Sequence, residues 1–327
     1  MDIDLKDRKL LYYLSLNSRM SLKKLGKKLN LHKNSVQYRI KRLEENGIIQ
    51  NYYTVIDIFK LNYKCIRFYI SYQFATPEIK KRIIDNFCTY DHIGVVYSIT
   101  GSMDLTVIFW VCNVNDFQKF WLKSYNKFGK YFDKQFLSLY YKVQIYPKTY
   151  LIPNINDSIL PDRTEYEIII GGDEEVKVDR IDMQILNIIA SDSRIPITTI
   201  AKKLNLSVKI IHYRLKKLSR LGLIKNFTIN IDISKLGYQW FKVDIYLNDH
   251  SKKKEIIQYL INNPYMVAID ITTGFSDIEV EFNVKDTVHL GDILDDLSEK
   301  FQGFVKNYTY MFIKENHKLF YFPKLLN

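Results

Sequence analysis

The sequence contains one long segment twice. Residues 7–63 align with residues 182–238 at a constant offset of 175, without a gap and with 22 identities in 57 positions. A segment repeated at this length folds the same way in both places, so it constrains the architecture more than any local pattern does. A shorter repeat follows in each half, where residues 100–105 match residues 273–278. The chain therefore has the order A-B-A′-B′, in which A and B are two different modules.

The periodicity of module A predicts three helices and a strand. An apolar stripe marks the first helix, Ser21 is placed to cap the second, and the third is expected over residues 32–45. Gly47 follows the third helix, as a left-handed terminating residue does, and the β-rich residues 48–58 supply a wing. This order predicts a winged helix-turn-helix, and module A′ repeats it.

Module B is expected to contain strands and helices in the order β-α-β-β-α-β, which is the ferredoxin-like arrangement. Its helices are expected near residues 77–88 and 115–128, and module B′ repeats the pattern. The expected fold class is therefore α+β, with two winged helix-turn-helix domains alternating with two ferredoxin-like domains. The expected boundaries are 1–63 and 179–238 for the winged domains, 64–152 and 239–327 for the ferredoxin-like domains, and 153–178 for a linker with an edge strand near residues 166–170.

The excess of basic charge lies in modules A and A′. Residues 1–63 contain 13 Lys and Arg against 6 Asp and Glu, and residues 182–238 contain 10 against 3, whereas the rest of the chain is nearly neutral. Positive charge confined to helix-turn-helix modules is expected of a surface that binds DNA phosphates. A solvated basic face without a partner is the alternative.

The third helix of each A module carries polar and basic residues opposite its apolar stripe. Asn and Gln can pair with the edge of adenine, and Lys and Arg later in the helix can bind phosphates. The third helix of module A is therefore expected to discriminate bases, and the third helix of module A′ to hold phosphate. For Arg39 and Arg214, near the core edge, a structural ion pair or a backbone contact explains the position at least as well as base contact. The residues expected to face double-stranded DNA are Lys33, Asn34, Ser35, Gln37, Tyr38, Lys41 and Arg42, and in the second copy Lys209, His212, Tyr213, Lys216 and Lys217.

A spaced pattern runs through both copies. The pattern is an Asp, an apolar pair, a Ser-Arg pair, an Arg followed by an apolar residue, and a Gly. In the first copy these are Asp7, Leu10-Leu11, Ser18-Arg19, Arg39-Ile40 and Gly47. In the second copy they are Asp182, Ile185-Leu186, Ser193-Arg194, Arg214-Leu215 and Gly222. With the Thr-Gly-x-x-Asp loops of B and B′, this pattern resembles the Lrp/AsnC (feast/famine) transcriptional regulators. The resemblance implies sequence-specific DNA binding and response to a small ligand such as an amino acid. Family members usually have one copy and dimerise, so B and B′ are expected to pair within one chain, and a homodimer of whole chains stays open.

The Thr-Gly-x-x-Asp loops are the effector site that the resemblance implies. The alternative is structural, because glycine permits a tight turn between strands and the aspartate caps it. The residues assigned to the effector site are Thr100, Gly101, Ser102, Asp104, Thr273, Gly274, Phe275 and Asp277.

An enzyme is the competing class of protein. This pair of modules also resembles the sirohaem decarboxylases, which carry a His/Tyr/Arg-rich segment before the central loop. The corresponding residues of this chain, 95–99 and 268–271, contain no His or Arg. The six histidines show no metal-ligand spacing, and no paired nucleophile and base stands out. We therefore expect no catalytic residue, no metal and no cofactor.

Membrane and secretory classes are also disfavoured. No apolar run approaches the ~18 residues of a membrane span, and the N-terminus lacks the basic-then-apolar order of a signal peptide. Cys65, Cys88 and Cys112 form no Cys-x-x-Cys pair. The expected protein is cytoplasmic, with free thiols and no membrane partner.

Overall fold

The structure is a computed structural model that describes residues 3–152, 162–320 and 322–323. Residues 153–161 of the expected linker, and the outermost residues of the first and last expected domains, lie outside the described residues. Modules A and A′ each form three helices and a strand, namely α1 (Leu5–Leu16), α2 (Leu22–Leu29), α3 (Lys33–Glu45) and β1 (Ile49–Ile56), then α6 (Arg180–Ala190), α7 (Ile197–Leu204), α8 (Val208–Arg220) and β7 (Ile224–Ile231).

Modules B and B′ each have the expected β-α-β-β-α-β order, so the α+β fold class is confirmed. Module B consists of β2 (Lys64–Tyr72), α4 (Pro77–Cys88), β3 (Ile93–Gly101), β4 (Leu105–Val111), α5 (Val114–Phe128) and β5 (Phe132–Ile145). Module B′ consists of β8 (Gln239–Leu247), α9 (Lys253–Asn262), β9 (Met266–Thr273), β10 (Ile278–Val284), α10 (Thr287–Lys300) and β11 (Val305–Leu319). The linker strand β6 (Ile168–Gly171) starts two residues later than expected and pairs with the end of β5.

Capping residues explain where the helices of module A begin and end. Ser21 accepts a hydrogen bond from the backbone N–H of Lys24, and His32 caps α3 from the position just before it. Gly47 has φ +63°, the left-handed conformation that ends a helix with little strain in glycine. The third helix therefore begins one residue later than expected, because His32 is its cap.

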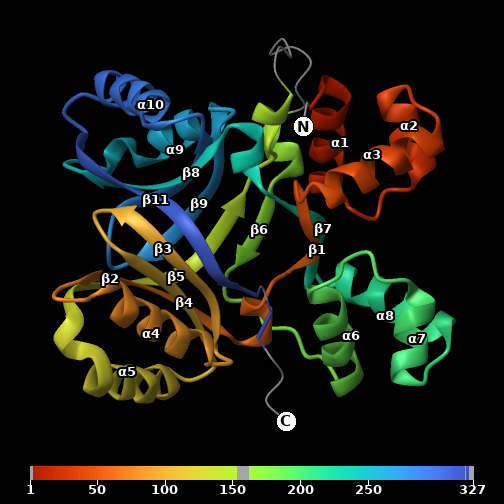
Figure 1. Ribbon diagram of the computed structural model, residues 1–327, viewed down its shortest axis with the longest axis horizontal. Helices are drawn as coiled ribbons and strands as arrows, with labels where there is room; N and C mark the ends of the chain where they lie inside the picture. Colours follow the sequence, from red (N-terminus) through yellow and green to blue (C-terminus); the bar gives the residue numbers. More distant parts are fainter. Residues whose placement is uncertain (1–2, 153–161, 321, 324–327) are drawn as a thin grey trace.

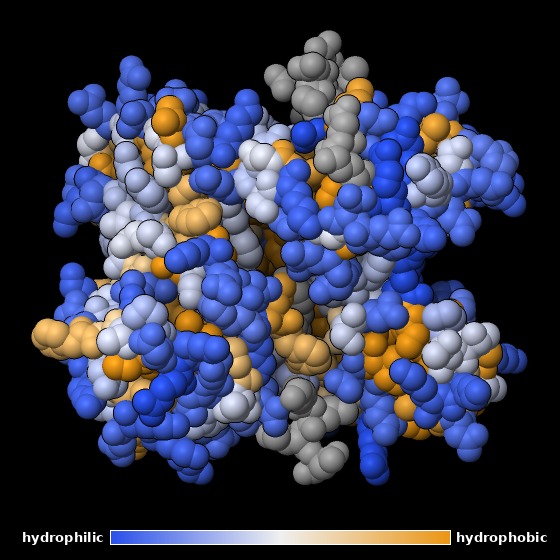
Figure 2. Space-filling view, viewed as in Figure 1, coloured by the Kyte–Doolittle hydropathy of each residue, from blue (hydrophilic) through white to orange (hydrophobic). Residues whose placement is uncertain are grey.

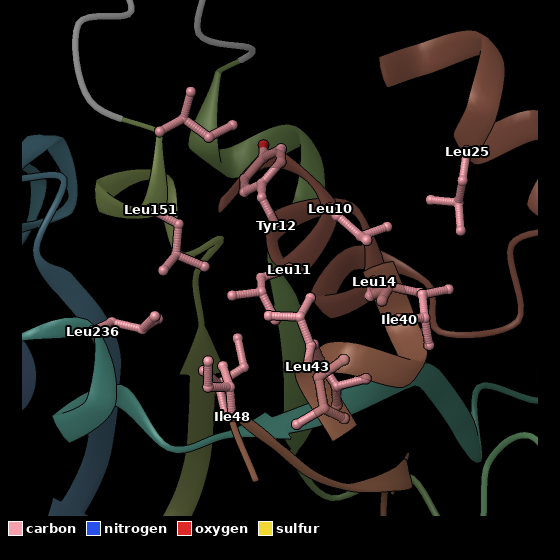
Figure 3. Packing of buried hydrophobic residues seen from close by; sticks show 14 of the residues in the cluster. Leu10, Leu11, Tyr12, Leu14, Leu25, Ile40, Leu43, Ile48, Leu151 and Leu236 are labelled. Carbon is pink, nitrogen blue, oxygen red and sulfur yellow. The ribbon is translucent and has the colours of Figure 1, made fainter. Parts of the chain in front are cut away.

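The wings of the two A modules pair with each other. Strand β1 runs antiparallel to β7, with Tyr53 opposite Thr228, which is its own equivalent in the repeat. Each wing also completes the core of the opposite module, because Ile229, Ile231 and Leu236 pack in the cluster that contains Leu10. Figure 3 shows Leu236 approaching this cluster from the second half of the chain. The two helix-turn-helix modules are thus joined through a shared ribbon.

The sheets of B and B′ join edge to edge into one closed structure. Strand β3 pairs with β11 and β5 pairs with β9, while β5 also pairs with β2 and β11 with β8. The long strands β5 and β11 therefore belong to both sheets. Helices α4 and α5 cover the outside of one sheet, and α9 and α10 cover the outside of the other (Figure 1). In the same view, module A lies beside B′ and module A′ lies beside B.

The faces that the two sheets turn toward each other combine buried charges with an apolar cluster around Tyr97 and Met311. Asp270 accepts hydrogen bonds from Arg67 Nη1 at 3.0 Å, from Lys242 Nζ at 2.8 Å and from the Tyr140 hydroxyl at 2.8 Å. The sequence suggests that residues 65–74 and 241–247 bury aromatic and branched faces against each other, and this holds only for Tyr69, whose ring is buried between the modules 5.3 Å from that of Phe275. Side chains alternate along a strand, so Phe68 and Phe241 pack on their own helices.

Candidate DNA interface

Helix α3 presents the residues that the sequence predicts for the first head. The side chains of Lys33, Asn34, Ser35, Gln37 and Lys41 are exposed, and Tyr38 is 66% exposed. A shallow groove of about 490 Å³ beside the helix is lined by Leu31, Asn34, Ser35, Tyr38, Arg39 and Arg42. Amide, hydroxyl and phenol groups thus share one open face, with donors and acceptors that can meet base edges.

Helix α8 presents a different set at the equivalent positions. Lys209, His212 and Lys216 are exposed, and Tyr213 is 64% exposed, close to the value for its equivalent Tyr38. Ile210, which replaces Ser35, is 41% exposed. The second head therefore offers cationic and apolar groups where the first offers neutral polar ones.

A buried carboxylate fixes each of these helices on its first helix. Asp7 is fully buried and accepts hydrogen bonds from Arg39 Nη1 at 2.7 Å and Arg42 Nη2 at 2.5 Å. Asp7 also forms a capping box with Asp4 at the start of α1. The carboxylate thereby links the start of α1 to the middle of α3.

The second head repeats this arrangement with Asp182 as the buried carboxylate. Arg214 Nη1 and Lys217 Nζ lie 2.7 and 2.8 Å from its oxygens. Arg214 also binds Asp179 and holds the pKa of that carboxyl below its ordinary value. Arg39 and Arg214 are thus in structural ion pairs, and Arg42 and Lys217, which the sequence assigns to DNA, share them. This role of Asp7 and Asp182 is not predicted from the sequence, although an aspartate at the same position in both copies is a visible signal.

Contacts across the two heads hold them together beside the wing ribbon. The backbone N–H of Ser18 donates to the Phe227 carbonyl at 2.7 Å, and that of Ser193 donates to the Tyr52 carbonyl at 3.1 Å. The Arg19 guanidinium lies 4.4 Å from the centre of the Phe227 ring, and Arg194 lies 4.9 Å from that of Tyr52. Each head therefore contacts the wing of the other through equivalent residues.

The Thr-Gly loops connect the edges of the two sheets. Gly101 has φ +136°, and a Cβ there would lie 2.4 Å from the Tyr310 carbonyl oxygen on β11. Gly274 has φ +132°, and a Cβ there would lie 2.5 Å from the Leu137 oxygen on β5. Glycine is required at both positions because the opposite module passes so close.

The remaining residues that the sequence assigns to an effector site divide into anchored and open groups. Asp104 accepts the backbone N–H of Tyr72 and Asp277 accepts that of Leu247, both at 2.8 Å, so the two aspartates fasten the loops to a neighbouring strand. Phe275 packs 4.7 Å from the ring of Phe136. The residues with exposed side chains are Thr100, Ser102 and Thr273.

Metal and membrane features are absent from the part of the chain that the structure describes. There, no group of three His, Cys, Asp or Glu side chains is arranged to hold a metal ion. Within the same ranges, no helix has both the length and the apolar character needed to cross a bilayer.

Comparisons with known proteins match both heads. A family model described as winged helix-turn-helix DNA-binding matches residues 3–50 and 178–225. The HTH-type transcriptional regulator FL11 of Pyrococcus horikoshii is 32% identical over 143 residues, which are 44% of this chain and 93% of that protein. The HTH-type transcriptional regulator LrpA of the same organism is 30% identical over 129 residues, which are 39% of this chain and 92% of LrpA.

A solved structure shares the whole architecture. The sirohaem decarboxylase NirDL aligns with a TM-score of 0.63 over 98% of this chain and 94% of its own, at 11% sequence identity. At that identity the likeness shows the fold alone. FL11 and LrpA are named as regulators and have about half this length, and the match spans more than nine tenths of each. The chain therefore belongs to the Lrp/AsnC family of helix-turn-helix transcriptional regulators, in a tandemly duplicated form.

Proposed function

We propose that one chain binds an operator of two unlike half-sites, one through α3 and one through α8, and thereby controls transcription in the cytoplasm. The observation that carries this proposal is the pairing of β1 with β7, which joins the two heads within a single chain. A single-copy regulator needs two identical chains to present two heads. This chain presents two different ones.

The first head supplies base discrimination. Asn34 and Gln37 are exposed on α3 and carry amides that can pair with both the acceptor and the donor on the adenine edge. The second head supplies phosphate contacts through Lys209 and Lys216, which are point charges without a fixed geometry. Heads docked in successive major grooves would meet half-sites about 34–36 Å apart, or a multiple of that distance.

Selection of binding sites from random duplex DNA, followed by footprinting, tests this function. We expect the full chain to enrich a bipartite site whose two halves differ. Asn34→Ala should relax the preference within one half only, whereas the matched control Gln118→Ala, on the exposed face of α5, should leave it unchanged. Failure to enrich any sequence above the input would refute the proposal.

We also propose that the Thr-Gly loops respond to a small ligand, such as an amino acid. The exposed hydroxyls of Thr100, Ser102 and Thr273 support this role, because they are hydrogen-bonding groups at the junction of the two modules. Calorimetric titration with single amino acids tests it, and Thr100→Val should weaken the binding of the ligand that gives heat. If no amino acid gives heat or changes DNA affinity, the loops serve only the turn.

A tetrapyrrole enzyme is the second candidate, and the fold shared with NirDL supports it. Residues 95–99 supply no His or Arg of their own, but β11 brings His317 to this segment, where its Nε2 lies 2.8 Å from the Ser98 hydroxyl. That imidazole is already engaged there and beside Glu315. Titration of the purified protein with an iron tetrapyrrole decides the matter, because a Soret band that shifts on binding would favour the enzyme and an unchanged spectrum the regulator.

A further inference from the structure

The last helices of the two ferredoxin-like modules, α5 and α10, carry opposite net charge. Residues 64–152 contain 12 Lys and Arg against 6 Asp and Glu, whereas residues 239–327 contain 10 against 13. The near-neutrality of the chain outside the heads therefore conceals a basic module and an acidic one. The exposed charges include Lys119, Lys123 and Lys127 on α5, and Asp292, Asp295, Asp296 and Glu299 on α10.

The internal repeat places these charges at equivalent positions. The offset of 173 that relates the two Thr-Gly loops also aligns the N-caps of α5 and α10, Asn113 and Asp286. It aligns their buried positions as well, because Phe128 falls on Phe301. At the exposed positions, Lys119 then falls on Asp292 and Lys123 on Asp296. Equivalent buried positions of α5 and α10 are therefore both apolar, whereas equivalent exposed positions carry charges of opposite sign.

Within one chain these helices do not meet. Helices α5 and α10 cover the outer sides of opposite sheets and lie at opposite ends of the paired modules (Figure 1). Opposite charges at equivalent positions would attract each other only if one chain's α5 faced another chain's α10. The partner that fits α5 is therefore a second copy of this chain.

We propose that chains associate head to tail, with α5 of one copy docked on α10 of the next. Both helices carry their charges four residues apart, on one face. In an antiparallel contact Lys119 meets Asp296 and Lys123 meets Asp292, whereas α5 against α5 would oppose lysine to lysine. A parallel contact would pair the same two lysines with the same two aspartates, so the charges select α10 as the partner helix of α5.

Exposed apolar side chains flank these charges and supply surface to bury. Val114 is 62% exposed and Leu122 51% on α5, and Val288 is 72% exposed on α10. Apolar patches interrupt the hydrophilic surface of module B in Figure 2. Phe74, between β2 and α4, is 87% exposed and has φ +51°, an uncommon conformation for a bulky residue. A surface that mixes apolar groups with charges of one sign is typical of a protein contact.

The contact joins two different surfaces, so it does not close on itself. Every added copy leaves one free α5 and one free α10, and the assembly grows as a row or closes into a ring. Association through these helices leaves α3 and α8 free, because the heads lie on the other side of the wing ribbon (Figure 1).

Sedimentation velocity of the DNA-free full chain at low ionic strength tests the proposal. The mean mass should rise with protein concentration and fall toward that of one chain at high salt, since exposed charges are screened. The variants K119D/K123D and D292K/D296K should each stay single. A mixture of the two variants in equal amounts should associate again. In K119D/K123D both α5 and α10 are acidic, and in D292K/D296K both are basic, so each variant complements the other.

The matched control reverses two exposed lysines on α7, K202D/K203D, and changes the net charge by the same amount. This control should associate like the unmodified chain. A chain that stays single at every concentration would overturn the proposal, and so would reversal variants that associate unchanged or a mixture that does not recover association. Because DNA is absent, each of these outcomes is independent of the function proposed for the heads.

Discussion

The side-chain hydroxyls of Ser18 and Ser193 lie 2.7 Å apart. These serines are equivalent residues of the repeat, and both are fully buried. Equivalent residues that touch each other mark the pseudo-twofold axis, which also passes between Tyr53 and Thr228 in the wing ribbon. The contact between the heads is therefore made by a repeated residue meeting its own copy.

Removing one of these hydroxyls should loosen the heads. Ser193→Ala leaves the Ser18 hydroxyl without its partner in a buried place, and an unsatisfied buried group costs about 1–3 kcal/mol. The free energy of unfolding, from urea denaturation, should fall by that amount, and the S18A/S193A double variant should lose less than the two single losses combined. The exposed Ser219→Ala is the control. Strict additivity of the two losses would show that the hydroxyls do not interact.

Asp7→Asn should destabilise the first head and displace α3. The change removes the charge that binds Arg39 and Arg42, and breaking a buried ion pair costs about 3–5 kcal/mol. We expect the lower end of that range, because the two arginines are 20% and 31% exposed and regain water. Amide hydrogen exchange in α1 and α3 measures the effect, with the exposed Glu45→Gln as control. Unchanged protection in α3 would exclude the proposed linkage.

The sequence specifies the modules but not how they interlock. Local signals such as the Ser21 cap and Gly47 act within a few residues, so they survive as sequence patterns. The pairing of β1 with β7 has no such signal. A wing strand carries the same alternation whichever partner it meets, and only the complete core around Leu10 selects the wing of the other half.

The buried charges between the sheets of B and B′ could not be predicted from the sequence, for a related reason. Arg67 and Asp270 are 203 positions apart in the sequence. Considered alone, each would be predicted to lie on the surface of its strand. Closure of both sheets brings them together. Likewise, the exposure of Asn34 and Gln37 follows from helical periodicity, but the engagement of Arg42 by Asp7 requires the relative placement of α1 and α3.

Asp244 should make stability depend on pH. Burial raises the pKa of this carboxyl to about 7, with Lys242 lowering it and Glu279 raising it further. The unfolded value is ~3.9, so between about pH 4 and 7 the folded state holds a proton that the unfolded state has lost. Stability therefore falls as pH rises through this window and levels off above it.

Thermal denaturation across the range from mildly acidic to mildly basic pH, compared with that of Asp244→Asn, isolates this contribution. Glu281 also has a pKa raised by burial and adds a slope of the same sign, which both proteins share. The difference in stability between the two proteins should shift in favour of the variant as pH rises toward the folded-state pKa of Asp244. A pH-independent difference would assign the slope to other groups.

Lys41→Ala and Lys216→Ala should weaken binding to all DNA sequences about equally. Both lysines are exposed at equivalent positions late in α3 and α8, unlike Arg42 and Lys217, whose charges also serve ion pairs with buried aspartates. Removing one lysine from a phosphate should lower the slope of log K against log salt by ~0.9. Fluorescence anisotropy across a salt series measures the slope, with K202A as control. An unchanged slope would show that these lysines do not bind phosphate.

Making the two heads alike should make the operator symmetric. The repeat aligns Asn34, Ser35 and Gln37 with Lys209, Ile210 and His212, and all six side chains are exposed. The variant K209N/I210S/H212Q therefore gives α8 the three side chains of α3 that we propose contact bases, while the wing ribbon keeps the heads in place. Each base contact is worth ~1–3 kcal/mol of discrimination, enough to change the selected sequence. Selection from random DNA should yield unlike half-sites for the original chain and an inverted repeat of the α3 half-site for the variant. Identical asymmetric sites for both proteins would mean that these positions do not read bases, and a palindrome selected by the original chain would mean that its heads are not functionally distinct.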